Sequence, residues 1–269
     1  MTQRVLVIGL DGATFDLIRP WAEAGKLPNL KRLLDSGSAA VLDSTIPPMS
    51  PSAWTSFMTG KNPGKHGIFD FTQRDYRNYR TLITSRSHEA TLWGILSHYN
   101  RRVCVMNVPQ TYPPEKVNGV MVTGLGTPAH HNFTYPTEEA ERLLAQGYQV
   151  NAKEGYRPGN EEAFLNSAFE ASDRQLEAAC AYLRAEPWDF FMLVLRHTDE
   201  VPHFFWKYMD PTHPAYEQGP ERWQNAILEC YQRSDAAIGE LIAAAGEGVN
   251  VVVMSDHGFG PLHRDVYLN

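Results

Sequence analysis

The chain has 269 residues, of which 43% are hydrophobic and 20% charged, and its formal net charge is −7. This composition is typical of a globular protein with one large domain, and it excludes a disordered chain, a collagen and a disulfide scaffold. Because sequence-independent binding to nucleic acid depends on Lys and Arg neutralising phosphates, the acidic charge argues against a nucleic-acid polymer as partner. A protein of this charge that handles phosphate needs another source of positive charge.

The N-terminal segment and the cysteines favour a cytoplasmic protein. The apolar stretch 5–10 is too short for the core of a signal peptide. No apolar run reaches the roughly 18 residues needed to span a bilayer, so we expect no membrane as a partner. Cys104, Cys180 and Cys230 are widely spaced among apolar residues, and we expect them to be buried, reduced thiols.

The apolar segments alternate in type along the chain. The pattern predicts a strand at 5–10, a helix at 28–34 that stops near Gly37, and a helix at 51–58 with Ser50 as candidate N-cap and Pro51 at its first position. The remaining predicted elements are a helix at 91–98, strands at 102–107 and 117–122, a helix at 161–185, a strand at 190–195, a helix at 221–245 and a strand at 250–254.

Strands that are apolar throughout and separated by helices predict an α/β fold. We expect a mostly parallel central sheet with helices on both faces, in a single domain spanning 1–269. The polar stretch 125–160 is expected to form an irregular or cap-like insertion.

Ionisable residues follow three of the predicted strands, at the sheet edge where functional groups gather in open α/β folds. The first strand runs into Asp11, the strand at 190–195 into Asp199 and His203, and the last strand into Asp256 and His257. Taken alone, Asp11 is as consistent with a turn or cap as with a ligand, and the aromatic surroundings of His203 favour a packed histidine. Five such groups at one edge are costly unless a positive ion lies between them, so we expect divalent metal there.

Ser50 is the candidate nucleophile. The sequence contains no Gly-x-Ser-x-Gly elbow, the motif that would indicate a Ser-His-Asp hydrolase. A serine hydroxyl is by itself a poor nucleophile at neutral pH. A divalent cation lowers the pKa of a bound water molecule to about 7 and acts similarly on an alcohol. A helix that starts just after Ser50 would add backbone N–H groups for an anionic phosphoryl group. The alternative is that Ser50 only caps this helix.

Four separated motifs, in order, resemble the alkaline phosphatase superfamily. They are Asp11 after a strand, Ser50 ahead of Thr59-Gly60-x-x-Pro63-Gly64-x-His66-Gly67, Asp199-x-x-x-His203, and Ser255-Asp256-His257-Gly258. The match runs from Val5 to Pro261 and is most similar to the type I phosphodiesterase and nucleotide pyrophosphatase branch, with its phosphohydrolase or phosphomutase members. The fold implied by this resemblance is the alkaline phosphatase-like three-layer sandwich.

The resemblance also implies a two-metal site, with zinc expected first and manganese as the alternative. The matched ligands are Asp11, Ser50, Asp256 and His257 for the metal that holds the nucleophile, and Asp199 and His203 for the metal that activates water. The implied reaction is hydrolysis of a small phosphate ester, either a monoester or a diester, through a phosphoryl-serine intermediate on Ser50.

Two features depart from the family pattern. The family's second metal has a further His well downstream, whereas only His263 follows His257 here, and we keep His263 as a candidate substitute. We therefore expect a chain that lacks the family's C-terminal part, and the alternative function is an incomplete or inactive metal-binding fragment. The family's phosphate-contacting Asn falls at Phe71, which leaves Asn107, at a predicted strand end, as a candidate for that contact.

Two other enzyme classes of the superfamily agree less well with the sequence. A sulfatase needs a modified Cys or Ser followed by x-Pro-x-Arg, whereas Ser50 is followed by Pro51-Ser52-Ala53-Trp54. A cofactor-independent phosphoglycerate mutase carries a large domain after the nucleophile, but strands of the main sheet already occupy the segment between Ser50 and Asp199. Aromatic residues at 69–71 and 204–208 are interpreted as core, with stacking on a substrate's base as the alternative.

Overall fold

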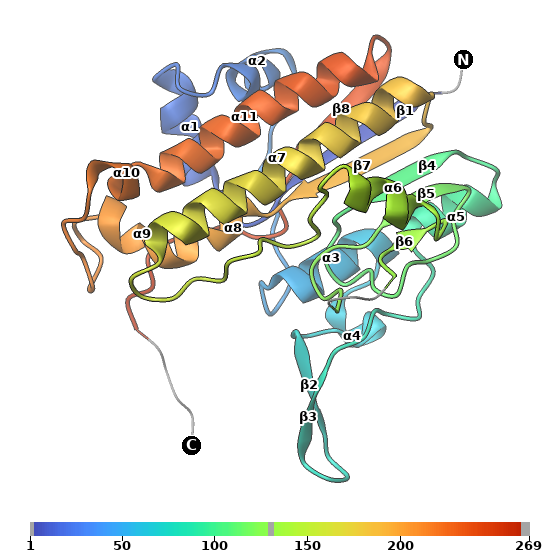
Figure 1. Ribbon diagram of the computed structural model, residues 1–269, viewed down its shortest axis with the longest axis horizontal. Coiled ribbons are helices and arrows are strands. Elements are labelled where there is room, and N and C mark those ends of the chain that lie inside the picture. The colour runs from blue at the N-terminus through green and yellow to red at the C-terminus, as the bar shows by residue number, and fades with distance from the viewer. Residues whose placement is uncertain (1–2, 129–131, 265–269) are drawn as a thin grey trace.

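A computed structural model describes residues 3–128 and 132–264, and a six-stranded sheet lies at its centre (Figure 1). The strand order is β6-β5-β4-β7-β1-β8. Neighbouring strands are parallel except for β5 and β6. The strands are β1 (Arg4–Leu10), β4 (Val103–Met106), β5 (Gly119–Val122), β6 (Thr134–Tyr135), β7 (Phe190–Leu195) and β8 (Val249–Met254). The expected mostly parallel α/β sheet is confirmed.

Helices cover both faces of the sheet, giving three layers (Figure 1). One face is packed against α1 (Phe15–Glu23), α2 (Pro28–Ser36), α7 (Glu161–Ala185) and α11 (Ala226–Ala245), and the other against α3 (Ser50–Thr59) and α5 (Leu92–His98). The short helices are α4 (Pro63–His66), α6 (Glu139–Ala145), α8 (His197–Glu200), α9 (Pro202–Met209) and α10 (Glu221–Gln224).

The alternation of side chains along β1 divides the core between the two faces. Leu6 and Ile8 are fully buried in the cluster under α7 and α11, whereas Val7 packs in the cluster that contains Trp54 of α3. Burial of one such aliphatic side chain stabilises the fold by roughly 1.5–3 kcal/mol. Gly9 is required beside Trp54, because a Cβ there would lie 2.6 Å from the indole ring.

Several elements differ from the sequence-based expectation. The helix expected at 221–245 is divided at Asn225 into α10 and α11, and α1, α8 and α9 were not predicted. The segment 125–160 contains β6 and α6, and residues 129–131 within it lie outside the described part of the chain. All three cysteines are buried and free, as expected. Among the helices of the described residues, none combines the length and the hydropathy of a membrane-spanning segment.

A second, two-stranded sheet projects from the body of the molecule (Figure 1). It is an antiparallel hairpin of β2 (Thr72–Asp75) and β3 (Arg80–Ile83), joined by residues 76–79. The hairpin follows α4, which packs against α3. The hairpin was not predicted from the sequence, because its strands lack a run of apolar residues.

Candidate active site

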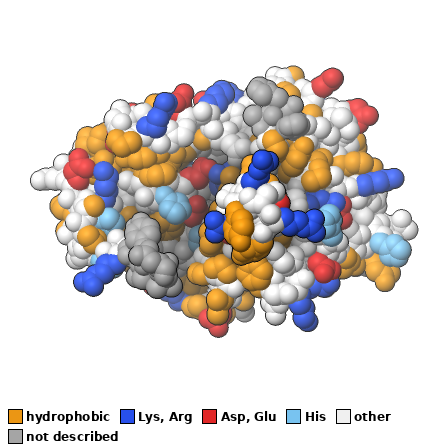
Figure 2. Space-filling model, turned by 90° about the horizontal axis from the view of Figure 1, so that it is seen from below, with side chains coloured by type: hydrophobic (Ala, Val, Ile, Leu, Met, Phe, Trp, Pro, Cys, Tyr) orange, Lys and Arg blue, Asp and Glu red, His pale blue; other side chains and the backbone are white. Residues whose placement is uncertain are grey.

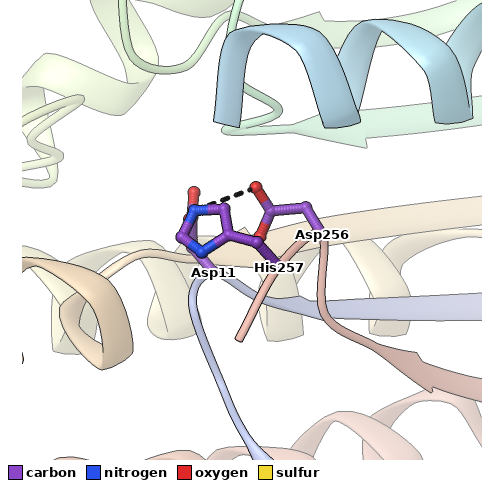
Figure 3. A group of neighbouring side chains, drawn as sticks. All are labelled: Asp11, Asp256 and His257. Atoms are coloured by element: carbon purple, nitrogen blue, oxygen red, sulfur yellow. Dashed lines mark ion pairs between the residues drawn. The ribbon is translucent and has the colours of Figure 1, made fainter. Parts of the chain in front are cut away.

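The topology of the sheet brings the expected residues together. Because β1 lies between β7 and β8, the residues that follow these three parallel strands meet at one edge. Figure 3 shows Asp11, Asp256 and His257 turned toward one another. Each offers one ligand atom, and these atoms lie within 4.8 Å of one another. Carboxylate and imidazole groups at these distances can hold a cation.

Ser50, at the start of α3, also contacts this cluster. Its hydroxyl donates a hydrogen bond to Asp11 Oδ1 at 3.2 Å and lies 3.2 Å from His257 Nε2. Ser50 is the first residue of α3, with Met49 in the N-cap position, so the expectations that Ser50 caps the helix and that Pro51 begins it are wrong. The reason is that the hydroxyl is held by Asp11 and His257 and not by a backbone N–H of its own helix.

The ring of His257 presents a lone pair to the cluster. Its Nδ1 lies 2.8 Å from the carbonyl oxygen of Gly258. Because a carbonyl oxygen only accepts, Nδ1 carries the proton, and Nε2 of the neutral ring is then free to bind a cation. A carbonyl that fixes the tautomer in this way is a common partner of metal-binding histidines.

The charged forms of the two carboxylates in the cluster are disfavoured by burial and by neighbouring acids. Burial, followed by repulsion from Asp199, raises the pKa of Asp11 to about 6. Burial, followed by repulsion from Asp11, raises the pKa of Asp256 to about 9. Asp256 Oδ1 accepts from the N–H of Gly12 at 3.2 Å, but Oδ2 is buried without a hydrogen bond among the described residues. A divalent cation would offset the cost of burying these negative groups and would bind the carboxylate oxygen that lacks a hydrogen bond. The residues therefore fit a metal ion.

A second pair of groups borders this cluster. Asp199 lies in α8 and His203 in α9, and His203 Nε2 is 3.4 Å from Asp199 Oδ1. That contact with Asp199 is the main cause that raises the pKa of His203. Asp199 Oδ1 is also 3.8 Å from His257 Nε2, so Asp199 connects His203 to the cluster of Asp11, Asp256 and His257. Asp199 and His203 together offer two potential metal-ligand atoms, a carboxylate oxygen and an imidazole nitrogen.

Two further candidates from the sequence are Asn107, for a phosphate contact, and His263, as a substitute ligand. Asn107 follows β4, is buried, and accepts a hydrogen bond from the hydroxyl of Tyr148. His263 is exposed. His263, the candidate substitute ligand, does not belong to the group of potential metal ligands found among the described residues.

Three groups that were not predicted from the sequence hold Asp11 and Asp256 in place. Trp54 Nε1 donates to Asp11 Oδ2 at 3.1 Å, the Thr198 hydroxyl donates to the backbone carbonyl of Asp11 at 2.7 Å, and the Gly12 N–H binds Asp256. Trp54 could have been found, because it lies four residues after Ser50 on a helix and therefore on the same face.

The family model of the type I phosphodiesterases and nucleotide pyrophosphatases matches residues 5–269. The chain belongs to this family. The membership confirms the resemblance inferred from the four motifs, in which Asp11, Ser50, Asp199 and the Asp256-His257 pair appear in order. No curated protein matches the chain in sequence.

Solved structures of distant relatives share the fold. Phosphonoacetate hydrolase from Sinorhizobium meliloti 1021, in complex with phosphonoformate, has a TM-score of 0.64 at 19% identity and covers 96% of this chain and 56% of its own. Murine ectonucleotide pyrophosphatase/phosphodiesterase 5, as an inactive variant in complex with AMP, has a TM-score of 0.56 at 16% identity, with 95% and 57% coverage. A putative sulfatase from Bacteroides thetaiotaomicron has a TM-score of 0.57 at 14% identity, with 100% and 62% coverage. The chain therefore spans less than two thirds of the length of these relatives.

Proposed function

We propose that the chain hydrolyses small phosphate esters through a phosphoryl intermediate on Ser50, at a site for two divalent metal ions. The observation that carries this proposal is the position of the Ser50 hydroxyl, 3.2 Å from both Asp11 Oδ1 and His257 Nε2. A serine that serves only the helix would have no reason to face a buried carboxylate and an imidazole. Family membership supports the same reaction class.

The proposed metal ligands divide as the family resemblance implies. They are Asp11, Ser50, Asp256 and His257 for the first ion, and Asp199 and His203 for the second. The mixture of carboxylate and imidazole groups suits zinc, and also manganese. When bound, such ions lower the pKa of the serine hydroxyl and offset the charge of the phosphoryl oxygens.

The residues of the chain position the reacting groups. Asp11 orients the Ser50 hydroxyl, and Trp54 in turn fixes Asp11 through its indole N–H. The first turn of α3 leaves the N–H groups of Ser50 and Ser52 without intrahelical acceptors, and its dipole favours an anion at this end. In the first step the Ser50 Oγ–P bond forms and the bond from phosphorus to the leaving alcohol breaks. The proton of the serine hydroxyl ends on the leaving alcohol. In the second step water forms a new O–P bond, the Ser50 Oγ–P bond breaks, the phosphate product leaves, and a proton from the water restores the serine hydroxyl.

The substrate is proposed to be a small anionic phosphorus compound. The relatives solved with phosphonoformate and with AMP bind ligands of this kind. The choice between monoester and diester is tested directly by turnover of p-nitrophenyl phosphate against bis(p-nitrophenyl) phosphate, each assayed with zinc and with manganese.

A second candidate function is that of a metal-binding protein without turnover. It is favoured by one observation, namely that Asp199 and His203 supply only two donors for the second ion. Because affinity depends on the number and geometry of ligands, this ion would bind weakly. Metal analysis of the purified chain separates the two functions: about two tightly held ions per chain favour the enzyme, and one or none favours the second candidate.

The decisive experiment is Ser50→Ala with Ser36→Ala as its matched control. Ser36 lies on α2, and its hydroxyl only binds the carbonyl of Arg32. We expect Ser50→Ala to lower turnover by at least about a thousandfold while the fold and the metal content persist. Ser36→Ala should retain full turnover. Unchanged turnover in Ser50→Ala would refute the mechanism.

A further inference from the structure

The β2–β3 hairpin is rooted beside the candidate nucleophile. The Ser52 hydroxyl, two residues from Ser50, donates to the carbonyl of Ile68, just before the hairpin. The Thr84 N–H donates to Phe71 at 2.8 Å and closes its base. Figure 2 looks along the projecting arm, which stands beside a hollow in this face and carries hydrophobic side chains with Lys and Arg around them.

Both faces of the hairpin are open to solvent. Tyr76, Tyr79 and Ile83 are 78%, 70% and 77% exposed, and Leu82 is 45% exposed. A two-stranded hairpin with no covered face is only marginally stable in water. Large exposed apolar side chains that cluster on such a hairpin indicate an interaction surface.

The hairpin carries a net positive charge in an acidic chain, because residues 72–83 contain three arginines and one acid, Asp75. Arg74, Arg77 and Arg80 form no ion pair with any residue in 3–128 or 132–264. The guanidinium of Arg74 lies over the ring of Tyr79, 5.6 Å from its centroid, which keeps the aromatic and the cationic groups together. In a chain of net charge −7, this cluster makes the arm a local site for anions.

We propose that this hairpin docks on the surface of a lipid bilayer that contains anionic phospholipids. The arginines would contact the headgroup phosphates, and Tyr76 and Tyr79, in the turn at the tip of the hairpin, would lie at the boundary between headgroups and acyl chains. A bilayer satisfies both the cationic and the aliphatic side chains of the arm. A nucleic acid would use the arginines and the tyrosines but offers little to Ile83 and Leu82.

Docking of the hairpin on a bilayer surface differs from insertion of a membrane-spanning segment. The expectation of no membrane partner rested on the lack of a spanning segment, and a hairpin that lies at the surface needs none. The proposal does not depend on the proposed activity. Docking and turnover of a soluble ester are measured separately, so failure of one leaves the other standing.

The test is co-sedimentation with vesicles of phosphatidylcholine, alone or with about one third phosphatidylglycerol. We expect binding only to the anionic vesicles, and weaker binding as salt screens the charges. Each arginine at such a surface strengthens partitioning roughly fivefold, so the triple variant Arg74→Gln, Arg77→Gln and Arg80→Gln should bind roughly a hundredfold more weakly.

The matched control changes the same charge elsewhere. The triple variant Arg19→Gln, Arg32→Gln and Arg184→Gln alters three exposed arginines outside the hairpin and should keep its affinity for vesicles. Tyr76→Ser with Tyr79→Ser should lower partitioning without changing net charge. Because every substituted side chain is exposed, all variants should keep the thermal melting of the parent chain.

Three results would overturn the proposal. The first is no binding of the parent chain to anionic vesicles. The second is an equal loss of binding in the two triple variants, which would indicate a nonspecific effect of net charge. The third is tight binding of a fluorescent single-stranded oligonucleotide in place of vesicles, which would assign the arm to nucleic acid.

Discussion

Asp11 and Asp256 place carboxylate oxygens within 4.8 Å of one another at the ends of the neighbouring parallel strands β1 and β8. Both side chains are buried, and burial is the first cause that raises their pKa values, to about 6 for Asp11 and about 9 for Asp256. The pair therefore destabilises the metal-free fold at neutral pH and is stabilised when a cation binds between the two groups. This coupling makes metal binding visible as a change in stability.

The variant Asp256→Asn tests the coupling in the metal-free chain. The folded-state pKa of Asp256 lies above its ordinary value of 3.8, so its stability contribution is full below that value and is lost as pH rises toward about 9. Asparagine does not titrate. We expect urea unfolding in EDTA to show a smaller loss of stability between about pH 5 and about pH 8 in Asp256→Asn than in the parent chain.

The same variant should also lose its response to zinc. Zinc at a hundred times its Kd stabilises a binding-competent chain by about 2.7 kcal/mol, and Asp256→Asn removes a charged ligand. The control is Asp43→Asn, which changes an exposed carboxylate. If the parent chain and Asp256→Asn gain equally from zinc, Asp256 is not a ligand.

Trp54→Phe tests whether the indole N–H positions Asp11. The bond from Trp54 Nε1 to Asp11 Oδ2 measures 3.1 Å, and it lowers the pKa of Asp11 against the larger effect of burial. Loss of a group that orients a ligand costs about 10–100-fold in metal affinity. We expect weaker zinc binding in competition with a chelator and a shift to higher pH in the acid limb of turnover.

The matched control for this variant is Trp93→Phe. Trp93 is also fully buried, but its Nε1 donates to Glu115 at 3.0 Å, away from the metal ligands. It should lose similar packing and leave zinc affinity and the pH profile unchanged. Equal effects in the two variants would assign Trp54 a purely structural role.

Most of the sheet was predictable because its strands are continuous apolar runs. β1 and β7 are buried on both faces, so their whole sequence reports burial, and the residues after them report the functional edge. The helix α1 escaped prediction because Pro20 lies inside it, and proline ordinarily ends a helix. β2 is polar and β3 has only two adjacent apolar residues, Leu82 and Ile83, so neither alternation nor an apolar run marked the hairpin.

Part of the site could not be read from local pattern. Ser before Pro is a common start of a helix, and only the tertiary contact with Asp11 shows that the Ser50 hydroxyl is used otherwise. The contribution of Gly12 likewise depends on what packs against it. In the sequence Gly12 is a turn residue, and in the structure Asp199 packs closely against it.

Gly12→Ala tests this close approach. Gly12 has φ of +67°, and a Cβ there would lie 2.9 Å from Asp199 Oδ1 and 3.2 Å from its Cα. The left-handed conformation costs about 1–2 kcal/mol for alanine, and overpacking adds about 1–3 kcal/mol. We expect lower stability in urea and reduced turnover, because Asp199 must move.

The control Gly60→Ala separates these two costs. Gly60 has φ of +64° at the end of α3, but a Cβ there meets nothing within 4 Å. It should show only the conformational cost and retain turnover. A Gly12→Ala chain as active as Gly60→Ala would show that the position of Asp199 tolerates displacement.

His66→Asn tests a pH-dependent anchor of the loop that leads to the hairpin. His66 Nδ1 accepts from the N–H of Ile68 at 3.1 Å, so Nε2 carries the proton and donates to the Ser56 hydroxyl at 2.9 Å. Burial lowers the pKa of His66 below its ordinary value of 6.5. Its contribution to stability is therefore full above about pH 6.5 and is lost as pH falls through the folded-state pKa.

Asparagine keeps an acceptor for the Ile68 N–H but does not titrate. We expect the stability difference between the parent chain and His66→Asn to shrink on acidification from about pH 7.5 to about pH 5.5, as measured by urea unfolding at each pH. His98→Asn, at an exposed position on α5, is the control. A difference for His66→Asn that stays constant across this range would mean that His66 binds protons equally in the folded and unfolded states, and the loop would then have no acid-sensitive anchor at this position.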